Sequence, residues 1–304
     1  MTAPFALLLL GPTASGKSAL SLALARRHPV EIISIDSALV YRGMDIGSAK
    51  PTPEERSVCP HHLIDVREID EPYSAADFLT DTARLVPEIR ARGRVPLIVG
   101  GTMLYAKALR EGLNDLPTTS PEVRSEVLEE GERLGWPAMW EKLREIDPET
   151  AARLQPADRQ RIGRALEVWR MTGKTLSSFH AKEAERLLPP DRKLLHRRIE
   201  ERFDAMLDAG FLAEVRDLMK SPRFDRESPA MRAVGYRQAI DYLSGERGFD
   251  EFRLAGVAAT RQLAKRQMTW MRSMPDLTLL DPDDPATLPT LDGMVETLEM
   301  GLGK

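Results

Sequence analysis

Eight consecutive residues near the N-terminus have the spacing of a phosphate-binding loop, G-x-x-x-x-G-K-[ST]. They are Gly11, Pro12, Thr13, Ala14, Ser15, Gly16, Lys17 and Ser18. In such a loop, backbone N–H groups and a helix N-terminus converge on an anion, the lysine adds a cation and the last hydroxyl can bind Mg²⁺. The loop is therefore predicted to bind a chain of phosphates, with Ser18 as a metal ligand. The motif leaves open whether a phosphoryl group is transferred or a diphosphate departs.

A carboxylate is expected close to this loop. An NTPase holds its metal with an acid that ends a second hydrophobic strand. The apolar run at residues 95–99 ends instead in Gly100, Gly101 and Thr102. Asp36 ends another apolar run, residues 31–35, where its side chain should point toward the phosphates. From its position alone, Asp36 could orient magnesium, accept a proton from a nucleophile or cap a turn.

Strands and helices alternate through the first third of the chain. Predicted strands lie at residues 5–10, 31–35, 62–66 and 95–99, and predicted helices at residues 17–27 and from Ser74, with Asp77 in a capping box, to about residue 92. This alternation predicts an α/β fold. Its core would be a P-loop NTPase-like parallel sheet, covered on both faces, with ligands at the carboxyl ends of the strands.

Helices alone are predicted in the middle of the chain. Proline follows a capping residue at Pro121 and at Pro148, which indicates two helix starts. Apolar residues spaced i, i+3, i+4 and i+7 predict one buried helical face formed by Ile162, Ala165, Leu166 and Trp169. We therefore expect an all-helical insertion, residues 114–190, within a P-loop catalytic core.

The catalytic core is expected to comprise residues 1–113 and 191–304. Its second part should continue through helices near residues 198–219, 231–243 and 251–272. Residues 281–304 contain proline and acidic residues with little periodicity, and no function is assigned to them.

Composition limits the class of protein. The chain has 304 residues, 42% of them hydrophobic, and no apolar run long enough to cross a bilayer, which predicts a soluble globular protein. A single cysteine, Cys59, excludes a disulfide framework and fits a reducing compartment, so the cytoplasm is expected. The formal net charge is −4, but residues 153–198 carry 12 basic and 5 acidic side chains, a local excess of +7. That excess suits a polyanion or a solvated surface equally well.

Seven blocks, taken in order, resemble one protein family across nearly the whole chain. They are residues 11–18, 36–51, 61–65, 100–105, 158–168, 233–238 and 260–267. The set is similar to the tRNA dimethylallyltransferases, also called isopentenylpyrophosphate transferases. Two residues depart from the pattern, since many members have Gln where Leu39 stands and Gly where Met103 stands.

The resemblance implies transfer of a dimethylallyl group from dimethylallyl diphosphate to the exocyclic amine of the adenine just 3′ of a tRNA anticodon. Allylic C–O cleavage releases diphosphate, so an anion cradle with Mg²⁺ would stabilise the departing charge. On this view Asp36 accepts the amine proton, Thr102 is a second polar contact at the reacting centre, and Lys17 is the third catalytic residue. Thr102 could equally cap the helix that follows it. The partners implied are the tRNA anticodon stem-loop and the prenyl donor, with a monomeric enzyme.

The resemblance also implies a set of residues that contact tRNA. Carried onto this sequence, they are Asp36, Ser37, Ala38, Leu39, Thr102, Arg124, Gln160, Arg161, Ile162, Gly163, Arg164, Arg232, Ala233, Val234, Gly235, Tyr236, Arg237 and Gln238. Arg161 and Arg164 share one helical face and can contact phosphates or base edges.

Residues 260–272 contain no acid and are predicted to add positive charge near the substrates. Arg261, Lys265 and Arg272 follow helical spacing and are expected to face the diphosphate or the RNA. Met268, Trp270 and Met271 are expected in the core or, as an alternative, along the slot for the five-carbon tail. His61 and His62 are expected to support the fold, because no further ligands stand at metal-binding spacing.

Three alternatives remain open at this stage. A P-loop small-molecule kinase would consume ATP without a prenyl donor. An adenine-nucleotide prenyltransferase would modify a free nucleotide, which offers little for a basic helical insertion to hold. A non-catalytic RNA-binding protein would leave tRNA unchanged and bind it with a salt-dependent affinity.

Overall fold

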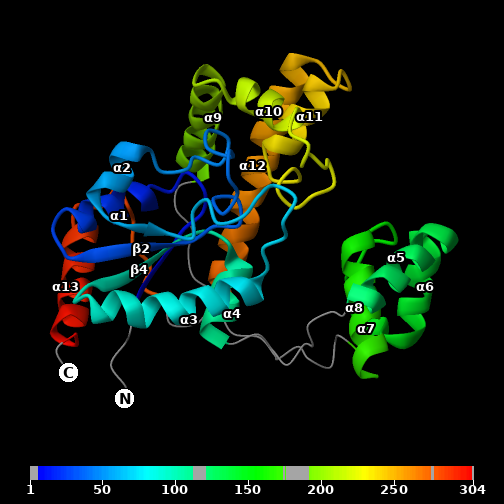
Figure 1. The fold of residues 1–304 in the computed structure, drawn as a ribbon, viewed down its shortest axis with the longest axis horizontal. Helices are drawn as coiled ribbons and strands as arrows, with labels where there is room; N and C mark the ends of the chain where they lie inside the picture. The colour runs from blue at the N-terminus through cyan, green and yellow to red at the C-terminus, as the bar shows by residue number, and fades with distance from the viewer. Residues whose placement is uncertain (1–5, 112–120, 174, 176–191, 275–276, 303–304) are drawn as a thin grey trace. The chain divides into compact units, whose positions relative to one another are not determined.

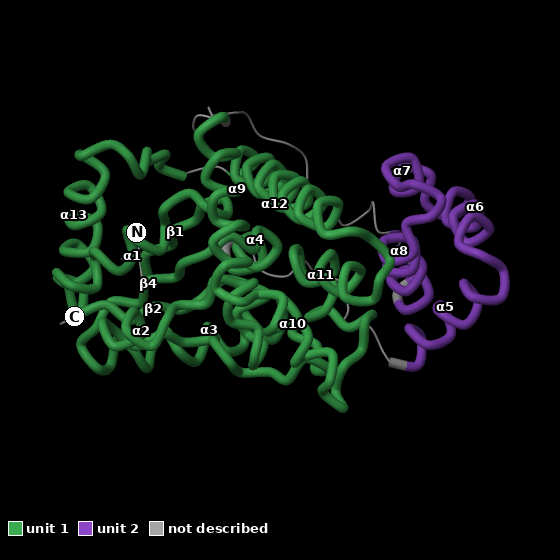
Figure 2. The backbone as a smooth tube through the Cα atoms, turned by 90° about the horizontal axis from the view of Figure 1, so that it is seen from above, with its two compact units in different colours: residues 1–110, 184–304 green, residues 111–183 purple. Residues whose placement is uncertain are grey.

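The computed structural model describes residues 6–111, 121–173, 175, 192–274 and 277–302. The chain divides into two compact units, one formed by residues 1–110 with 184–304 and the other by residues 111–183 (Figure 2). The predicted insertion, residues 114–190, overlaps the second unit. Among the described residues, no helix has both the length and the apolar composition that crossing a membrane requires.

A four-stranded parallel sheet forms the centre of the first unit. Its strands are β1 (Leu7–Leu10), β2 (Val30–Ile35), β3 (His61–His62) and β4 (Val95–Gly100), in the order β1-β4-β2-β3. The central strands pair in parallel, with Ile35 opposite Gly100 and Leu10 also opposite Gly100. The three strands therefore end at one edge, which confirms the predicted α/β class and brings the residues after β1, β2 and β4 together.

The predicted strand at residues 62–66 is wrong beyond its first residue. β3 pairs with β2 only at His61 and His62, because Leu63 and Asp65 take left-handed backbone conformations with φ of 62° and 56°. An extended strand cannot continue through such residues. The Asp65 carboxylate instead forms ion pairs with Lys50 and Arg56, at 2.5 and 3.0 Å.

Helices cover both faces of the sheet (Figure 1). They are α1 (Lys17–Ala25), α2 (Pro53–Val58), α3 (Ala75–Ala91), α4 (Met103–Glu111) and α13 (Thr287–Met300). Alternation along β2 places Ile33 in the cluster that includes Phe78 of α3, and Ile32 in the cluster that includes Leu24 of α1. The predicted capping box at the start of α3 is confirmed, since Ser74 and Asp77 exchange hydrogen bonds.

Helix α13 lies in the segment to which the sequence assigned no regular structure. Leu291, Val295 and Leu298 follow the spacing i, i+4 and i+7 and are buried beside the sheet. Pro289 and Gly293 weaken the helical pattern, but proline is tolerated in a first helical turn, where N–H groups lack partners. The segment therefore completes one face of the core.

Four further helices complete the first unit: α9 (Arg192–Asp208), α10 (Phe211–Met219), α11 (Tyr236–Leu243) and α12 (Phe249–Arg272). The predicted range 198–219 contains two helices, because Gly210, with φ of 99°, ends α9. The range 231–243 is helical only from Tyr236 onward. The predicted helix at 251–272 is confirmed as the main part of α12.

The second unit is entirely helical in its described part. Its helices are α5 (Pro121–Leu134), α6 (Trp136–Ile146), α7 (Pro148–Ala151) and α8 (Arg159–Thr172). The predicted buried face of α8 is confirmed for Ile162, Ala165 and Leu166, which are at most 3% exposed. It is wrong for Trp169, which is 39% exposed. Trp169 lies in the last turn of α8, and so large a ring is seldom fully covered there.

Candidate active site

A cavity of about 860 Å³ lies in the first unit at the carboxyl edge of the sheet. Residues that follow β1, β2 and β4 form one part of its lining, and α9, α12 and the segment before α11 form another. The residues after β1, β2 and β4 lie together because parallel strands end at the same edge of the sheet. The folding of a distant C-terminal part of the chain over the same edge closes the space.

The predicted phosphate loop joins β1 to α1 at this edge. The Gly11 N–H donates to the Gly100 carbonyl at 3.2 Å, which anchors the start of the loop to β4. The Lys17 ammonium donates to the Pro12 carbonyl at 3.2 Å, so its side chain folds back over the loop. Of the eight predicted phosphate-binding residues, the cavity lining includes Thr13, Ala14, Lys17 and Ser18.

Two partly buried cations and one carboxylate line the cavity and lie close enough for their charges to interact. Burial lowers the pKa of Lys17 to about 8; the charge of Asp36 opposes this shift and that of Arg202 adds to it. Burial also lowers the pKa of Arg202, again against the attraction of Asp36. Cations that lose hydration in this way gain most when an anion binds, so the pair is suited to a diphosphate.

Arg202 was not predicted from the sequence. It lies on α9 between Ile199 and Phe203, which are both buried and both line the same cavity. An arginine flanked by core positions of one helix is the signal that could have drawn attention to it.

Asp36 and Thr102 follow the ends of β2 and β4, and both line the cavity. The Asp36 carboxylate accepts a hydrogen bond from the Ala38 N–H at 2.9 Å. The Thr102 hydroxyl accepts one from the Ser37 N–H at 3.0 Å. The Thr102 hydroxyl therefore fixes the turn after Asp36. The second Asp36 oxygen accepts no hydrogen bond from the described residues and is available for a ligand.

Gln267 of α12 joins the phosphate loop to the turn after β4. Its side-chain oxygen accepts from the Thr13 N–H at 3.0 Å, and its side-chain nitrogen donates to the Gly101 carbonyl at 2.8 Å. A Cβ on residue 101 would lie 2.4 Å from that nitrogen, so this approach requires glycine. The sequence did not predict this role, since only the fold places α12 against the loop.

The cationic face of α12 differs from the predicted one. Leu263, Arg266, Gln267 and Trp270 follow the spacing i, i+3, i+4 and i+7 and line the cavity. Arg261, Lys265 and Arg272 belong to other faces of the helix and do not occur in the cavity lining. Arg261 instead forms an ion pair with Glu200 of α9, at 2.8 Å.

The residues predicted to contact tRNA are divided between the two units. In the first unit the cavity lining includes Asp36, Ser37, Ala38, Leu39, Thr102, Arg232, Ala233, Val234, Gly235 and Tyr236. Tyr236 is fully buried, so its side chain is part of the protein interior. Arg237 and Gln238 begin α11 beside this lining, and the Gln238 side chain accepts from the Gly235 N–H at 2.8 Å.

The remaining predicted contacts lie in the second unit. Arg124, Gln160 and Arg161 are exposed. Ile162 is 0% exposed and packs inside that unit, so its side chain cannot reach RNA, and neighbouring Gly163 is also buried. Arg164 lies 3.6 Å from Glu167 on the same helix.

The side chains that line the cavity suit a magnesium ion that is coordinated mainly by substrate phosphates and water. Among the described residues there is no group of three or more His, Cys, Asp or Glu side chains that could form a metal cage. Mg²⁺ commonly keeps several waters and uses one or two protein ligands with substrate phosphates. Ser18, in the cavity lining, fits that requirement. The Nε2 of His62 lies 2.7 Å from Glu31, which fits the predicted fold-supporting role, whereas His61 occurs in the cavity lining.

Comparison with known proteins identifies close relatives. A protein-family model described as IPP transferase matches residues 39–274. The tRNA dimethylallyltransferase of Aromatoleum aromaticum is 54% identical over 292 residues, covering 91% of each chain. That of Paraburkholderia xenovorans is 56% identical over 290 residues, covering 91% of this chain and 92% of its own.

Solved structures have the same fold. The full-length tRNA isopentenylpyrophosphate transferase of Bacillus halodurans matches with a TM-score of 0.70 at 35% identity, covering 99% of this chain and 98% of that one. A eukaryotic dimethylallyltransferase acting on tRNA matches with a TM-score of 0.75 at 28% identity, covering 94% of this chain and 75% of that one.

Proposed function

The chain belongs to the IPP transferase family, and from this premise we propose that it is a tRNA dimethylallyltransferase. It moves a dimethylallyl group from dimethylallyl diphosphate to the exocyclic amine of the adenine 3′ of a tRNA anticodon. The observation that carries the proposal is a single cavity that holds a phosphate loop, the Asp36 carboxylate and the Thr102 hydroxyl at the ends of three parallel strands.

The diphosphate of the donor binds at the phosphate loop. Lys17 and Arg202, both in the cavity lining, supply positive charge, and the loop supplies backbone N–H groups. Ser18 is the residue that would hold Mg²⁺ together with the diphosphate; when bound, the ion adds charge that stabilises the departing diphosphate. Because these groups act on charge that grows as the C–O bond breaks, they favour the transition state over the bound donor.

The amine nitrogen of adenine forms a bond to the first carbon of the prenyl group while the bond from that carbon to the diphosphate oxygen breaks. The nitrogen then carries one proton too many, and Asp36 accepts it. Proton transfer to a positioned base of this kind contributes about 10²-fold to 10⁴-fold in rate. The hydrogen bonds of Thr102 to Ser37 and of Asp36 to Ala38 hold the carboxylate in place.

The adenine must leave the stacked anticodon loop to reach this cavity, which costs a few kcal/mol. Residues 37–39 and 232–235 form walls of the cavity and are proposed to receive the extruded base. The helical insertion, residues 114–190, is proposed to bind the RNA through basic side chains such as Arg124 and Arg161, which offsets that cost.

Prenyl transfer is tested by incubating the protein with dimethylallyl diphosphate, Mg²⁺ and tRNA that lacks the modification. We expect one C5H8 unit on an adenosine of the anticodon loop, located by mass spectrometry of digested tRNA. Parallel reactions replace tRNA with adenosine monophosphate, or replace the donor with ATP and candidate small alcohols. Modification of the free nucleotide, or ADP release without a prenyl donor, would support the alternative enzyme classes instead.

A further inference from the structure

Glu214, on α10, receives four hydrogen bonds from two different walls of the cavity, although its own side chain does not occur in the lining. One oxygen accepts from the N–H groups of Asp45 and Ile46, at 2.9 and 2.6 Å. The other accepts from the Gly47 N–H at 3.2 Å and from the Tyr236 hydroxyl at 2.6 Å. One carboxylate therefore joins the loop after β2 to the start of α11.

The loop after β2, residues 36–52, has no helix or extended strand of its own, yet it carries Asp36. Two charged side chains, Lys50 and Glu214, fix the part of the loop that follows Val40. The buried Lys50 ammonium donates to the Tyr41 carbonyl at 2.8 Å and to Asp45 and Asp65 at 2.6 and 2.5 Å. Glu214 holds residues 45–47, which lie between Tyr41 and Lys50 in the loop. A loop of this length that keeps one shape needs such anchors, because its backbone groups lack regular partners.

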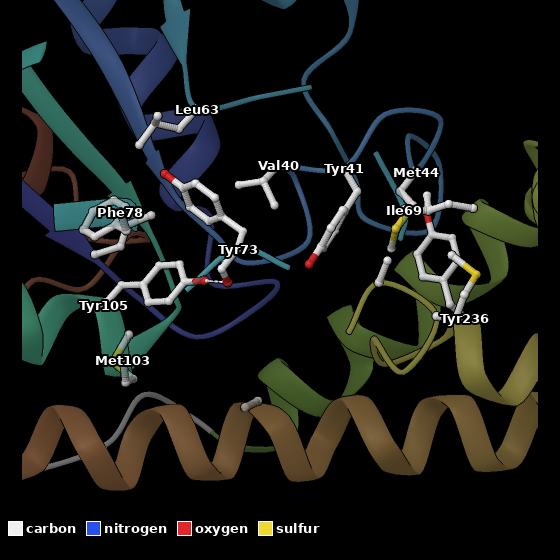
Figure 3. Packing of buried hydrophobic residues seen from close by; sticks show 14 of the residues in the cluster. Val40, Tyr41, Met44, Leu63, Ile69, Tyr73, Phe78, Met103, Tyr105 and Tyr236 are labelled. Carbon is white, nitrogen blue, oxygen red and sulfur yellow. Dashed lines mark hydrogen bonds between the residues drawn. The ribbon is translucent and has the colours of Figure 1, made fainter. Parts of the chain in front are cut away.

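The second wall begins at Tyr236. Burial, together with the charge of Glu214, raises the pKa of Tyr236, so its hydroxyl remains a donor at all ordinary pH values. In Figure 3 the ring of Tyr236 lies beside Met44 of the loop. Phe211, one turn before Glu214 on α10, packs against the same ring with centroids 5.1 Å apart. The segment 232–235, which leads into Tyr236, lines the cavity.

We propose that Glu214 is a positioning residue that sets the distance between the two walls receiving the extruded adenine. It touches no substrate and acts through the loop at residues 45–47 and through Tyr236. This inference rests on the proposed function, because it assigns the two walls to the tRNA base. Its consequence is that changes at Glu214 weaken the productive binding of tRNA much more than the binding of the prenyl donor, because none of these four hydrogen bonds involves the phosphate loop.

The two oxygens of Glu214 allow graded substitutions. Glu214→Ala removes all four hydrogen bonds. Glu214→Gln keeps an oxygen for Asp45 and Ile46, and its NH₂ can donate to the Tyr236 oxygen but not accept from the Gly47 N–H. Tyr236→Phe removes one donor and keeps the loop contacts. Asp217→Ala is the matched control, because Asp217 is an exposed carboxylate of the same helix that pairs with nearby Lys220 at 2.7 Å.

For each variant we measure kcat and the KM values for tRNA and for the prenyl donor. Amide hydrogen exchange at residues 45–47 is measured as well. We expect the tRNA KM to rise about 10-fold to 100-fold in Glu214→Ala, less in Glu214→Gln and about threefold in Tyr236→Phe. Donor KM should stay within about twofold, Asp217→Ala should match the wild type, and exchange at Ile46 and Gly47 should accelerate in Glu214→Ala. If Glu214→Ala does not fold, Glu214→Gln and Tyr236→Phe serve as the test, since both should raise the tRNA KM more than the donor KM.

An unchanged tRNA KM in folded Glu214→Ala or Glu214→Gln would overturn the assignment. So would equal increases of the tRNA and donor KM values, which a general loosening of the fold would produce. Failure of the proposed function is separate, since the wild-type protein would then form no prenylated adenosine. In that case tRNA dissociation constants and exchange rates of the same variants still decide whether Glu214 sets the walls of an RNA-binding cavity.

Discussion

The Gln267 side-chain oxygen accepts a hydrogen bond from the Thr13 N–H at 3.0 Å, across 254 residues of sequence. The same amide donates to the Gly101 carbonyl. The phosphate loop and the turn that carries Thr102 are thus held together by one side chain from α12. In the proposed function, this link sets the distance between the donor's diphosphate and the reacting centre.

Replacing Gln267 with Ala should therefore impair the donor site. The Thr13 N–H and the Gly101 carbonyl lose a buried partner, which costs about 1 to 3 kcal/mol. We expect the donor KM to rise about tenfold with little change in tRNA affinity, measured by steady-state kinetics and RNA binding. Gln262→Ala, an exposed glutamine of the same helix, is the control. Equal behaviour of the two variants would contradict the role given to Gln267.

Lys17 makes donor binding depend on pH. With a pKa of about 8, its ammonium is charged below that pH and neutral above it, so donor KM should rise as the pH passes through 8. Between about 8 and its ordinary value of 10.5 the unfolded chain binds the extra proton, so this group adds stability as pH rises there. Loss of affinity in that window is thus not unfolding caused by Lys17. In Lys17→Met the rise of donor KM near pH 8 should vanish. The donor KM of this variant should be higher than that of the wild type and should depend less on pH.

Thr102 is predicted to act through the turn that holds Asp36. Thr102→Val keeps the shape but leaves the Ser37 N–H without its partner at 3.0 Å, whereas Thr102→Ser keeps the hydroxyl. We expect kcat to fall about 10-fold to 100-fold in Thr102→Val and much less in Thr102→Ser. Circular dichroism of both variants checks that the fold is retained. A Thr102→Ser variant as slow as Thr102→Val would indicate that the methyl group, not the hydroxyl, is what matters.

Helix α13 should stabilise the core although it is far in sequence from the sheet it covers. Leu291 is 2% exposed, so Leu291→Ala should lower the free energy of unfolding by about 2 to 5 kcal/mol. Met300, at the end of the same helix, is 72% exposed, and Met300→Ala should be close to neutral. Chemical denaturation measures both. Similar stabilities for the two variants would mean that α13 does not pack as described.

Local sequence patterns predicted most of the site that lies near the phosphate loop. The loop, Asp36 and Thr102 each end or follow an apolar run, and parallel strands bring such positions to one edge. The roles of Arg202, Gln267 and Glu214 were not predicted, because each acts on a segment far away in sequence. Gln267 lies in one of the blocks that carry the family resemblance, but that block assigned it no role. The predicted strand at residues 62–66 extended too far, because nothing in the residue types indicates the left-handed conformations of Leu63 and Asp65.

The helix at residues 287–300 was missed for another reason. Its apolar spacing is present, but proline and glycine within it lower the local propensity, and burial against β1 and β4 decides the outcome. Tertiary packing of this kind is invisible to a local pattern. On α12 the pattern was helical, but which face meets the cavity depended on α9 and the phosphate loop.

Separating RNA binding from turnover at Asp36 tests the central claim most directly. Asp36→Asn can still accept from the Ala38 N–H, so the turn should survive, but an amide cannot take the amine proton. We predict that this variant binds unmodified tRNA with an affinity within about threefold of the wild type, while its prenylation rate falls at least about 100-fold. A variant that prenylates adenosine at nearly the wild-type rate, or that loses tRNA binding as fully as it loses turnover, would contradict the assignment of Asp36 as the base.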